Sequence, residues 1–407
     1  MRILIVSWAW PPIARIGSLR PLGLAREWRT LGHEVHVVTG PGDRGGEPTP
    51  DLIAEAETTG ATVHRADAPG LRPQTRQAAF DLQPSEVVAT KEISRLRQIL
   101  AQWRRFPDDA RSWIGPATAL AAELHRRTAF DVVWSTSPPE SVHYVAAGVA
   151  QQIPWVADFR DQWSDYLLAR WDPVSRLVID RITSRILVNA RAVTAATDGV
   201  AKSLLRASGK EVISVRNGFD QMPIAAGPVR ARHLGYFGRI DPLMQHPERL
   251  WEPLRTARRK GKPWAVEFFA APGGGGGSAV VAPPDLRELV RVSSPLPHAR
   301  ALASMQTMGA LLVLAWETRG GETTVGGKVY EYIGSGRPIL VCAPNGFEAR
   351  NLVEATRTGI GAWGDHEIAE ALERLETFRP DPIGREQLSR RKSAEAFVTL
   401  FERIRRS

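Results

Sequence analysis

Short apolar runs separated by helical stretches recur along the whole chain. Strands of a parallel sheet are covered on both faces, so they appear in a sequence as continuous apolar runs without polar alternation. The pattern therefore predicts parallel β-sheets whose strands are connected by helices. In the first half, strands are expected at 2–7, 34–38, 62–64, 131–135, 155–157, 192–195 and 212–215, and helices at about 19–31, 116–127, 141–151, 175–189 and 198–207.

The second half of the chain repeats this pattern. Two successive β/α series predict an α/β fold of two Rossmann-like, doubly wound parallel-sheet domains that face a cleft. The hinge between them is expected at 218–230, where Gly, Pro and Ala replace any periodic pattern. Strands are expected at 233–237, 265–269, 289–292, 309–314, 339–342 and 359–362, and helices at 246–259, 297–305, 328–335 and 367–377.

Two segments interrupt the alternation. Residues 69–107 form a long insertion that contains one amphipathic stretch, 91–106. Its apolar face predicts either a helix packed on the domain or a weak peripheral contact with a membrane surface or a lipid-linked acceptor. The glycine run Gly273–Gly277 lacks the Gly-Lys-Ser/Thr ending of a P-loop, so we interpret it as a flexible connection between strands.

The composition is that of a globular protein, with 43% hydrophobic and 24% charged residues. A net charge of +9 is compatible with nucleic acid or an anionic membrane as a partner. However, only seven of the 53 basic residues are Lys, and the Arg residues are dispersed along the chain instead of clustered. Because the sequence has neither a basic tail nor a basic and aromatic stacking surface, we expect no nucleic acid partner.

Cys342 is the only cysteine, which excludes an intramolecular disulfide and a cysteine-based metal cluster. It stands in an apolar run, where a buried structural thiol is expected. No apolar run reaches the roughly 18 to 20 residues that span a bilayer. The apolar start of the chain ends in Pro11–Pro12 and lacks a small-residue cleavage site, so we interpret it as a first strand and not as a signal peptide. These features predict a soluble, cytoplasmic protein.

Polar residues in the first half follow expected strands, which is where parallel sheets bind ligands. Gly17 stands between the first strand and the first helix, where backbone amides can approach an anion. Ser137, Glu140 and His143 follow the fourth expected strand and open a helix. His143 is either a group for proton transfer or a histidine satisfied within the core.

Asp158, Arg160 and Asp161 directly follow the next expected strand. Two carboxylates that flank a guanidinium predict one of two arrangements. One is an ion-pair network that holds the loop in place. The other is a site for substrate hydroxyl groups, since ionised carboxylates accept strong hydrogen bonds. No His or Cys is adjacent, so we expect no metal site here.

The most informative segment is Gly320–Leu340. A glycine loop with two threonines runs directly into a helix, which presents amides and the positive end of the helix dipole to a diphosphate. Lys328 and Glu331 lie three residues apart, about one helical turn. One face of this helix therefore offers a cation for phosphates and a carboxylate for ribose hydroxyls. The segment predicts a site for a nucleoside diphosphate.

In their order and spacing, these segments resemble the retaining glycosyltransferases of family 4, which have the GT-B fold. The resemblance covers nearly the whole chain and is closest to the branch that acts in polysaccharide and secondary-metabolite biosynthesis. It is carried by Pro11–Pro12 with Gly17, Gly-His-Glu-Val-His-Val-Val-Thr at 32–39, Ser-Thr-Ser-Pro-Pro at 135–139, Asp-Phe-Arg-Asp at 158–161, 215–220, 235–239 and 328–338.

The resemblance implies that residues 1–218 form the acceptor domain, that 219–386 hold the donor, and that 387–407 form a C-terminal helix crossing back to the first domain. It implies a UDP-, GDP- or dTDP-linked sugar as donor and a small-molecule, glycan or lipid-linked hydroxyl acceptor, with no cofactor and no metal. Arg239 matches the family's diphosphate-binding arginine, and Glu331 matches its ribose-binding glutamate. The expected donor-binding residues are Gly17, Arg239, Glu322, Thr323, Thr324, Val325, Gly326, Gly327, Lys328 and Glu331, of which Arg239, Lys328 and Glu331 are expected to be catalytic. The expected acceptor-binding residues are Ser137, Glu140, His143, Asp158, Arg160 and Asp161.

The chain departs from the family pattern at three places. The first glutamate of the family's Glu-x7-Glu motif aligns with Thr323, and Glu322 is displaced by one residue. Met-Gln-His at 244–246 stands where the family has a diphosphate-binding lysine, and our hypothesis is that Lys328 supplies that charge. Gln162 replaces the proline of the family's Phe-Arg-Asp-Pro-Trp motif. Two other functions stay open. One is a different nucleotide-sugar or sugar-phosphate reaction on the same fold, such as epimerisation or phosphorolysis, and the other is non-catalytic binding of an anionic ligand.

Overall fold

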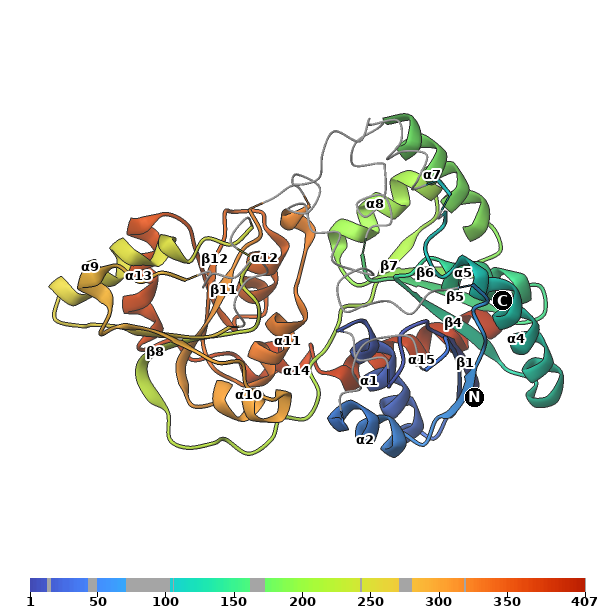
Figure 1. Ribbon diagram of the computed structural model, residues 1–407, viewed down its shortest axis with the longest axis horizontal. Helices are drawn as coiled ribbons and strands as arrows, with labels where there is room; N and C mark the ends of the chain where they lie inside the picture. The colour runs from blue at the N-terminus through green and yellow to red at the C-terminus, as the bar shows by residue number, and fades with distance from the viewer. Residues whose placement is uncertain are drawn as a thin grey trace. The chain divides into compact units, whose positions relative to one another are not determined.

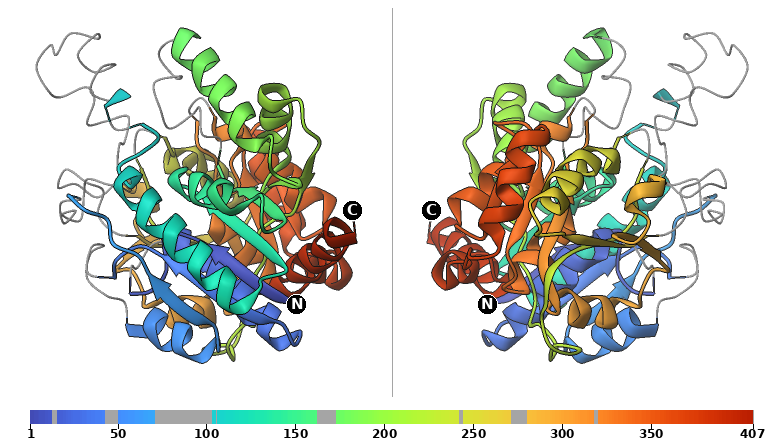
Figure 2. Two further views of the ribbon diagram at one scale, coloured as in Figure 1. Left: turned by 90° about the vertical axis from the view of Figure 1, so that its right-hand side faces the viewer. Right: turned by 90° about the vertical axis from the view of Figure 1, so that its left-hand side faces the viewer.

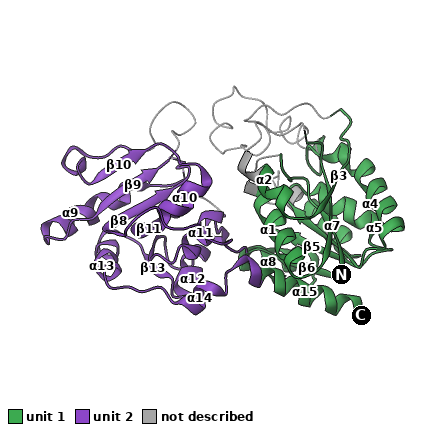
Figure 3. Cartoon of the chain, turned by 90° about the horizontal axis from the view of Figure 1, so that it is seen from below, with its two compact units in different colours: residues 1–216, 393–407 green, residues 217–392 purple. Residues whose placement is uncertain are grey.

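The computed structural model of the chain describes residues 1–12, 16–42, 50–70, 103–104, 106–161, 173–241, 244–270, 280–317 and 320–406. These residues form two compact units (Figure 3). Unit 1 comprises Met1–Arg216 with Ser393–Ser407, and unit 2 comprises Asn217–Lys392. The end of the chain therefore returns to the first unit after the second has been completed.

Unit 1 is built on a seven-stranded parallel sheet with the order β3-β2-β1-β4-β5-β6-β7. The apolar runs become strands covered on both faces, as in β1, where Ile3 to Val6 are fully buried. The order reverses between β1 and β4, so the crevice at their carboxyl ends is a natural ligand position. The strands are β1 (Arg2–Val6), β2 (Glu34–Thr39), β3 (Thr62–Arg65), β4 (Val132–Ser137), β5 (Trp155–Phe159), β6 (Ala192–Ala195) and β7 (Val212–Ser214).

Helices cover both faces of this sheet (Figures 1 and 2). Trp28 of α1 and Phe397 of α15 pack against Trp134 of β4 with ring centroids 5.4 and 5.5 Å away, which fastens the C-terminal helix to unit 1. The helices α4, α5 and α8 pack on the opposite face. The helical segments are α1 (Ile16–Thr30), α2 (Pro50–Thr58), η1 (Arg111–Trp113), α4 (Ile114–Thr128), α5 (Ser141–Val149), α7 (Pro173–Leu187), α8 (Asp198–Ser208) and α15 (Arg390–Arg406).

Unit 2 is built on a six-stranded parallel sheet with the order β10-β9-β8-β11-β12-β13, which reverses between β8 and β11. Helices α9 and α13 cover one face, and α10, α11 and α12 cover the other. The strands are β8 (Arg230–Phe237), β9 (Ala265–Phe269), β10 (Val290–Ser293), β11 (Met308–Leu314), β12 (Ile339–Cys342) and β13 (Gly359–Ala362). The helical segments are η3 (Pro247–Leu250), α9 (Trp251–Arg259), η4 (Pro284–Leu286), α10 (His298–Met305), η5 (Gly321–Thr323), α11 (Gly327–Gly334), α12 (Glu348–Ala355), α13 (Asp365–Leu375) and α14 (Pro382–Glu386).

The predicted fold class is confirmed, since both units are parallel α/β sheets with helices on both faces. The helix expected at 246–259 was wrong in its first part, where a 3-10 turn precedes α9. Pro253 has no N–H to donate, so an α-helix that began at His246 would lack a bond in its second turn; beginning at Trp251 places Pro253 in the first turn. The sequence pattern missed α2 and α12, two short helices of nine and eight residues.

The insertion predicted at 69–107 lies mostly outside the described residues, and so does the glycine run Gly273–Gly277. At the end of the insertion, Trp103 and Phe106 stack on each other and pack against Ile179 of α7. Cys342 is buried in β12, as expected of a structural thiol. Within the described ranges, no helix combines the length and the apolar character that crossing a bilayer requires.

Candidate functional site

The unit 2 site lies where β8 and β11 end, at the point where the strand order reverses. Gly238 and Arg239 directly follow β8. The loop after β11 leads through the turn at Gly321–Thr323 into α11, whose first residues are Gly327 and Lys328. Except for Gly17, which lies in α1 of unit 1, the predicted donor residues thus come from two distant parts of the sequence to the same region of unit 2.

Tyr236, near the end of β8, is the centre of a hydrogen-bond network that the sequence did not reveal. Lys328 Nζ donates to Tyr236 Oη at 2.6 Å, and the ammonium lies 4.0 Å from the centre of the tyrosine ring. Gln245 Nε2 also donates to Tyr236 Oη at 3.1 Å, while the Tyr236 hydroxyl donates to the Arg239 carbonyl oxygen at 2.8 Å. The hydroxyl therefore connects α11, the loop after β8 and the backbone of Arg239.

Gly238 brings the Lys328 ammonium close to this loop. Its φ of +121° is a conformation that residues with a Cβ rarely adopt, and a Cβ here would lie 3.4 Å from Lys328 Nζ. The ammonium consequently lies beside Gly238. The next residue, Arg239, is exposed. Removal of the ammonium from water lowers the pKa of Lys328 to about 7, and Glu331 opposes this shift. The Lys328 ammonium thus lies beside the segment that carries a second cationic residue, Arg239.

The glycine loop before α11 is held by its own polar side chains. The Oγ1 atoms of Thr323 and Thr324 donate to the Gly320 carbonyl oxygen at 3.1 and 2.9 Å, and Glu322 Oε2 accepts from the Gly320 amide at 2.9 Å. Helix α11 starts without a side-chain cap from the described residues, which leaves its first amides to face an anion. Val325 packs into the apolar core of unit 2, so only its backbone can serve a donor.

Glu331 lies one turn after Lys328 and is joined to a residue that the sequence reasoning missed. His298 Nε2 lies 3.0 Å from Glu331 Oε1 and comes from the first turn of α10. This contact orients the carboxylate that we expect to bind ribose hydroxyls. Nothing in the sequence around His298 resembles a motif, because the contact depends on how α10 and α11 pack on the same face of the sheet.

A hollow in unit 2 has a volume of about 330 Å³ and is lined by His246, Glu248, Arg249 and Asp365. The Arg249 guanidinium stacks on the Trp363 ring at 3.9 Å and forms two hydrogen bonds with the Glu317 carboxylate. Arg249 is thus already paired with a carboxylate. None of the described residues that line the hollow is one of the predicted donor-binding residues.

In unit 1, Asp158 is fully buried, and both oxygens of its carboxylate accept two hydrogen bonds each from protein groups. Arg20 donates from Nη2 to Oδ1 at 2.8 Å and from Nε to Oδ2 at 3.0 Å. Thr194 and Thr136 complete the arrangement with hydroxyl donors at 2.8 Å each. This geometry corrects the expectation that Asp158 binds an acceptor, because no lone pair is left for a ligand and four partners compensate the burial of the charge. The ion-pair interpretation holds for this residue.

Arg160 is likewise engaged with the protein itself. Its Nε and Nη2 donate to the carbonyl oxygens of Ser137 and Pro138 at 2.7 Å each, and Nη1 donates to the Gly17 carbonyl oxygen. A Cβ on Gly17 would lie 3.0 Å from Arg160 Nη1, which explains the glycine at the start of α1. Arg160 therefore ties the loop after β4 to α1, and this close contact favours glycine at position 17 independently of any donor.

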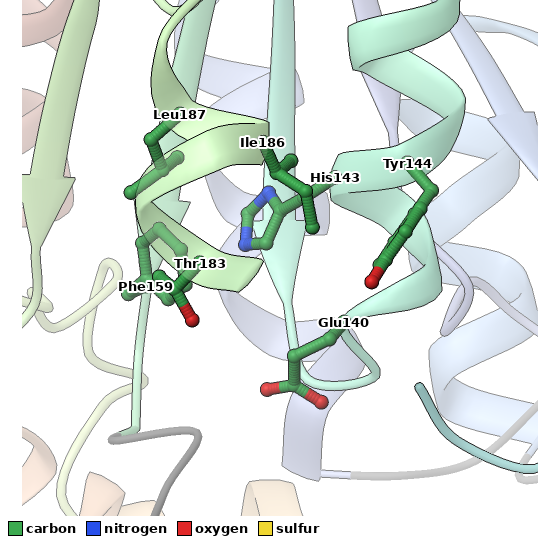
Figure 4. A pocket seen from close by; sticks show the side chains of 7 residues that line it. All are labelled: Glu140, His143, Tyr144, Phe159, Thr183, Ile186 and Leu187. Carbon is green, nitrogen blue, oxygen red and sulfur yellow. The ribbon is translucent and has the colours of Figure 1, made fainter. Parts of the chain in front are cut away.

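His143 and Glu140 lie inside unit 1, in a small pocket between α5, β5 and α7. Figure 4 shows the imidazole of His143 between the α7 side chains and Tyr144, with the Glu140 carboxyl group below it. The space between these side chains is too small to admit a water molecule. His143 Nδ1 lies 2.9 Å from Ser135 Oγ, and burial lowers the pKa of His143 to about 3. A buried imidazole with so low a pKa is a weak base that solvent does not reach, which favours the core interpretation of His143 over proton transfer.

Glu140 is a buried carboxyl group beside other acids. Burial raises its pKa well above the usual value, and the nearby Asp108 adds to the shift. Asp108 itself accepts from the amide and the hydroxyl of Ser141 at 2.7 and 2.6 Å, which fixes the start of α5. Of the residues predicted to bind the acceptor, Asp161 is half-buried, whereas Ser137 is buried at the end of β4.

Replacing Glu140 with glutamine is expected to stabilise unit 1 by about 1 kcal/mol or more near pH 8. A carboxyl group whose folded pKa is raised binds more protons in the folded than in the unfolded state, so its contribution to stability falls as pH rises above about 4.5. Thermal unfolding at pH 5 and pH 8 measures this, and the advantage of Glu140→Gln over the wild type should grow with pH. Glu123→Gln, on the exposed face of α4, is the control. An advantage that does not change with pH would contradict the expected burial of a neutral carboxyl group.

Residues 19–218 match the family model described as Glycosyl transferase 4-like domain. This match begins in α1 and ends at the last residue before Phe219, so it spans most of unit 1. No curated protein matches the sequence.

Among solved structures, the chain is similar to HepE from Anabaena in complex with UDP, with 13% sequence identity and a TM-score of 0.64 over 99% of this chain and 100% of that one. Sucrose-phosphate synthase from Thermosynechococcus elongatus has 14% identity and a TM-score of 0.61, covering 99% and 98%. A glycosyltransferase from Rickettsia africae has 10% identity and a TM-score of 0.59, also covering 99% and 98%. At these identities the similarity establishes the fold.

Proposed function

Because residues 19–218 belong to the glycosyl transferase 4-like family and the chain has the fold of GT-B glycosyltransferases, we propose that the protein transfers a sugar from a nucleoside diphosphate sugar to a hydroxyl group. We further propose that the anomeric configuration is retained and that no metal ion is needed. The observation that carries the proposal is the position of the Lys328 ammonium, held at Tyr236 beside the Gly238–Arg239 segment.

The donor would be held by unit 2 through its diphosphate and ribose. Negative charge grows on the diphosphate as the bond to the sugar breaks, and fixed positive groups lower the energy of that transition state. Lys328, Arg239 and the first amides of α11 are the groups that would face this charge. Glu331, oriented by His298, would accept hydrogen bonds from the ribose hydroxyls.

The acceptor would be positioned by unit 1. The buried His143, whose pKa is lowered to about 3, is too weak a base for this role, and the carboxylate of Asp158 is fully bonded. A retaining reaction in which the leaving group and the acceptor lie on the same face of the sugar does not strictly require one, because the departing diphosphate can take the acceptor proton. Asp161, at the carboxyl edge beside β5, is the residue that we retain for acceptor positioning.

A thermal-shift screen with UDP, GDP, dTDP and ADP tests the donor site. UDP comes first because the similar HepE structure contains UDP. A ligand at 100 times its Kd stabilises the folded state by about 2.7 kcal/mol. We therefore expect one diphosphate to raise the unfolding temperature of unit 2 by about 5–10 °C, and its monophosphate to raise it less. If none of the four nucleotides changes the unfolding temperature, the proposed site is wrong.

The reaction is tested with the sugar conjugate of the stabilising nucleotide, incubated with and without acceptor in the presence of EDTA. Release of the nucleoside diphosphate only with acceptor, and an NMR coupling constant that reports the donor's anomeric configuration in the product, would support retaining glycosyl transfer without metal. Sugar conversion without acceptor would instead indicate an epimerase. Consumption of the conjugate only with inorganic phosphate would indicate phosphorolysis.

A further inference from the structure

The hydroxyl group of Tyr236 uses its full hydrogen-bonding capacity inside unit 2. The side chain is buried at the end of β8, yet the hydroxyl meets three polar partners, two from the stretch after β8 and one from α11. A tyrosine hydroxyl has one proton to donate and two lone pairs to accept with. The Arg239 carbonyl oxygen takes the proton, and Lys328 and Gln245 occupy the lone pairs. The orientation of the hydroxyl is consequently determined on all sides.

This arrangement limits where the Lys328 ammonium can lie. A lysine side chain has four rotatable bonds and loses considerable entropy when it is held in one place. The hydrogen bond to Tyr236 Oη and the contact with the ring face hold the ammonium from one side, through 2.6 and 4.0 Å contacts. The bond to Tyr236 uses one of three N–H donors, so two remain for phosphate oxygens.

Gln245 supports Tyr236 from the opposite direction. Its Nε2 donates both to Tyr236 Oη and to the Leu314 carbonyl oxygen at 3.2 Å, and its Oε1 accepts from the Asp241 amide at 3.2 Å. The residue is buried, with 4% of its surface exposed. Gln245 therefore links the ends of β8 and β11, and it does so through the same hydroxyl that holds Lys328.

We propose that Tyr236, supported by Gln245, is a positioning residue for diphosphate recognition: its hydroxyl holds the Lys328 ammonium beside Gly238 with two N–H bonds directed to the ligand. The inference rests on the proposed function, because it assumes that Lys328 binds the diphosphate of the donor. Tyr236 itself acts through Lys328 and is not assigned a contact with the donor.

The test compares Tyr236→Phe with the wild type and with Lys328→Ala, by calorimetric titration of the nucleoside diphosphate that gives the largest thermal shift among UDP, GDP, dTDP and ADP. The phenylalanine keeps the ring under the ammonium and removes only the hydroxyl. We expect Tyr236→Phe to weaken binding about 5- to 20-fold, less than Lys328→Ala. Tyr144→Phe, which removes a tyrosine hydroxyl from unit 1, is the control and should bind as the wild type does.

The pH profile distinguishes positioning from a general loss of packing. Among the described residues, the charged and titratable groups that face the Lys328 ammonium are Glu331 on α11 and Tyr236 on β8. Loss of the Tyr236 hydroxyl removes an acceptor from the ammonium, so the pH midpoint of binding should move to lower pH. A variant that only loosened the fold would weaken binding equally at every pH.

Each outcome supports the proposal or overturns it. Should Tyr236→Phe bind with the wild-type Kd and pH midpoint while Lys328→Ala binds weakly, Tyr236 has no positioning role and the donor site stands. Should Lys328→Ala also bind as the wild type does, both the inference and the assignment of Lys328 fail. If Tyr236→Phe does not fold, Gln245→Met provides the second variant, for which we expect binding about two- to fivefold weaker and the same direction of pH shift.

Discussion

Replacing Lys328 with alanine is expected to weaken the binding of the nucleoside diphosphate by about 10- to 100-fold. A charge-assisted hydrogen bond contributes about 1.5–3 kcal/mol, which corresponds to this range. The ammonium is already in place, since Tyr236 holds it at 2.6 Å, so little entropy is lost on binding. Calorimetric titration with the nucleotide identified in the thermal-shift screen measures the change.

The same lysine should make nucleotide binding depend on pH. The pKa of Lys328 is about 7, and only the protonated form attracts phosphate. Affinity should therefore fall as pH rises through 7, approaching a tenfold loss per pH unit above it, until binding relies on the other donors alone. The range from pH 6.5 to 9 is suitable, because the terminal phosphate of the ligand is mostly ionised throughout it. In Lys328→Ala the dependence should be absent.

A matched control separates the position of the charge from charge alone. Lys260→Ala removes a lysine from the same unit, where it forms an exposed ion pair with Glu373. This variant should retain both the wild-type affinity and its pH dependence. If the two alanine variants bind equally well, the diphosphate does not contact Lys328, and the candidate site would have to be placed elsewhere.

Replacing Asp158 with asparagine is expected to destabilise unit 1 by about 3–5 kcal/mol, because it leaves the Arg20 guanidinium buried without its counter-charge. The side chains of Arg20 and Asp158 are only 2% and 0% exposed, so solvent cannot compensate. In a unit of this size, the loss corresponds to a decrease in unfolding temperature of about 6–20 °C. Differential scanning calorimetry measures it directly.

The control for this prediction is Asp198→Asn, which removes an ion pair of Asp198 with Arg216 on the partly exposed surface of unit 1. Exposed pairs contribute about 0–1 kcal/mol, so its effect should be small. A similarly small effect of Asp158→Asn would mean that the buried carboxylate is not structural, and acceptor binding would again be the better explanation of Asp158.

The strands could be predicted from short stretches of sequence, because a strand buried on both faces is itself a run of apolar residues. In Ile3–Val6 of β1 and in β12, burial on both faces of the sheet makes successive residues apolar, and this signal can be recognised without any knowledge of the neighbouring strands. The 3-10 turn before α9 depended instead on Pro253, whose effect on the helix start is a matter of single hydrogen bonds. Local pattern therefore predicts the existence of an element better than its ends.

Some residues of the candidate site could be predicted from the sequence, and others could not. The loop Gly320–Gly327, Lys328 and Glu331 were recognisable because the loop, the helix start and the one-turn spacing are contiguous in sequence. Tyr236 and His298 were missed because their partners lie 92 and 33 residues away, in segments brought together by packing, and Gln245 was missed because its bond nine residues back depends on the course of the loop after β8. The sequence around Asp158 was compatible with an ion-pair network and with a site for substrate hydroxyl groups. The contact with Arg20, which is 138 residues away, favours the ion pair.

The two parallel α/β units and a loop and helix suited to a diphosphate follow from the amino-acid sequence alone, because hydrophobic periodicity and backbone chemistry act over a few neighbouring residues. Which charges are available to a ligand depends on the folded arrangement of the chain. Asp158 and Arg160 beside a strand end and Lys328 at a helix start are all candidate ligand-binding charges in the sequence. In the structure, buried partners occupy Asp158, backbone carbonyl oxygens hold Arg160, and Lys328 lies beside Gly238 with N–H donors left for a ligand. Hydrogen bonding and desolvation depend on atoms brought together from distant segments, and so they follow from packing alone.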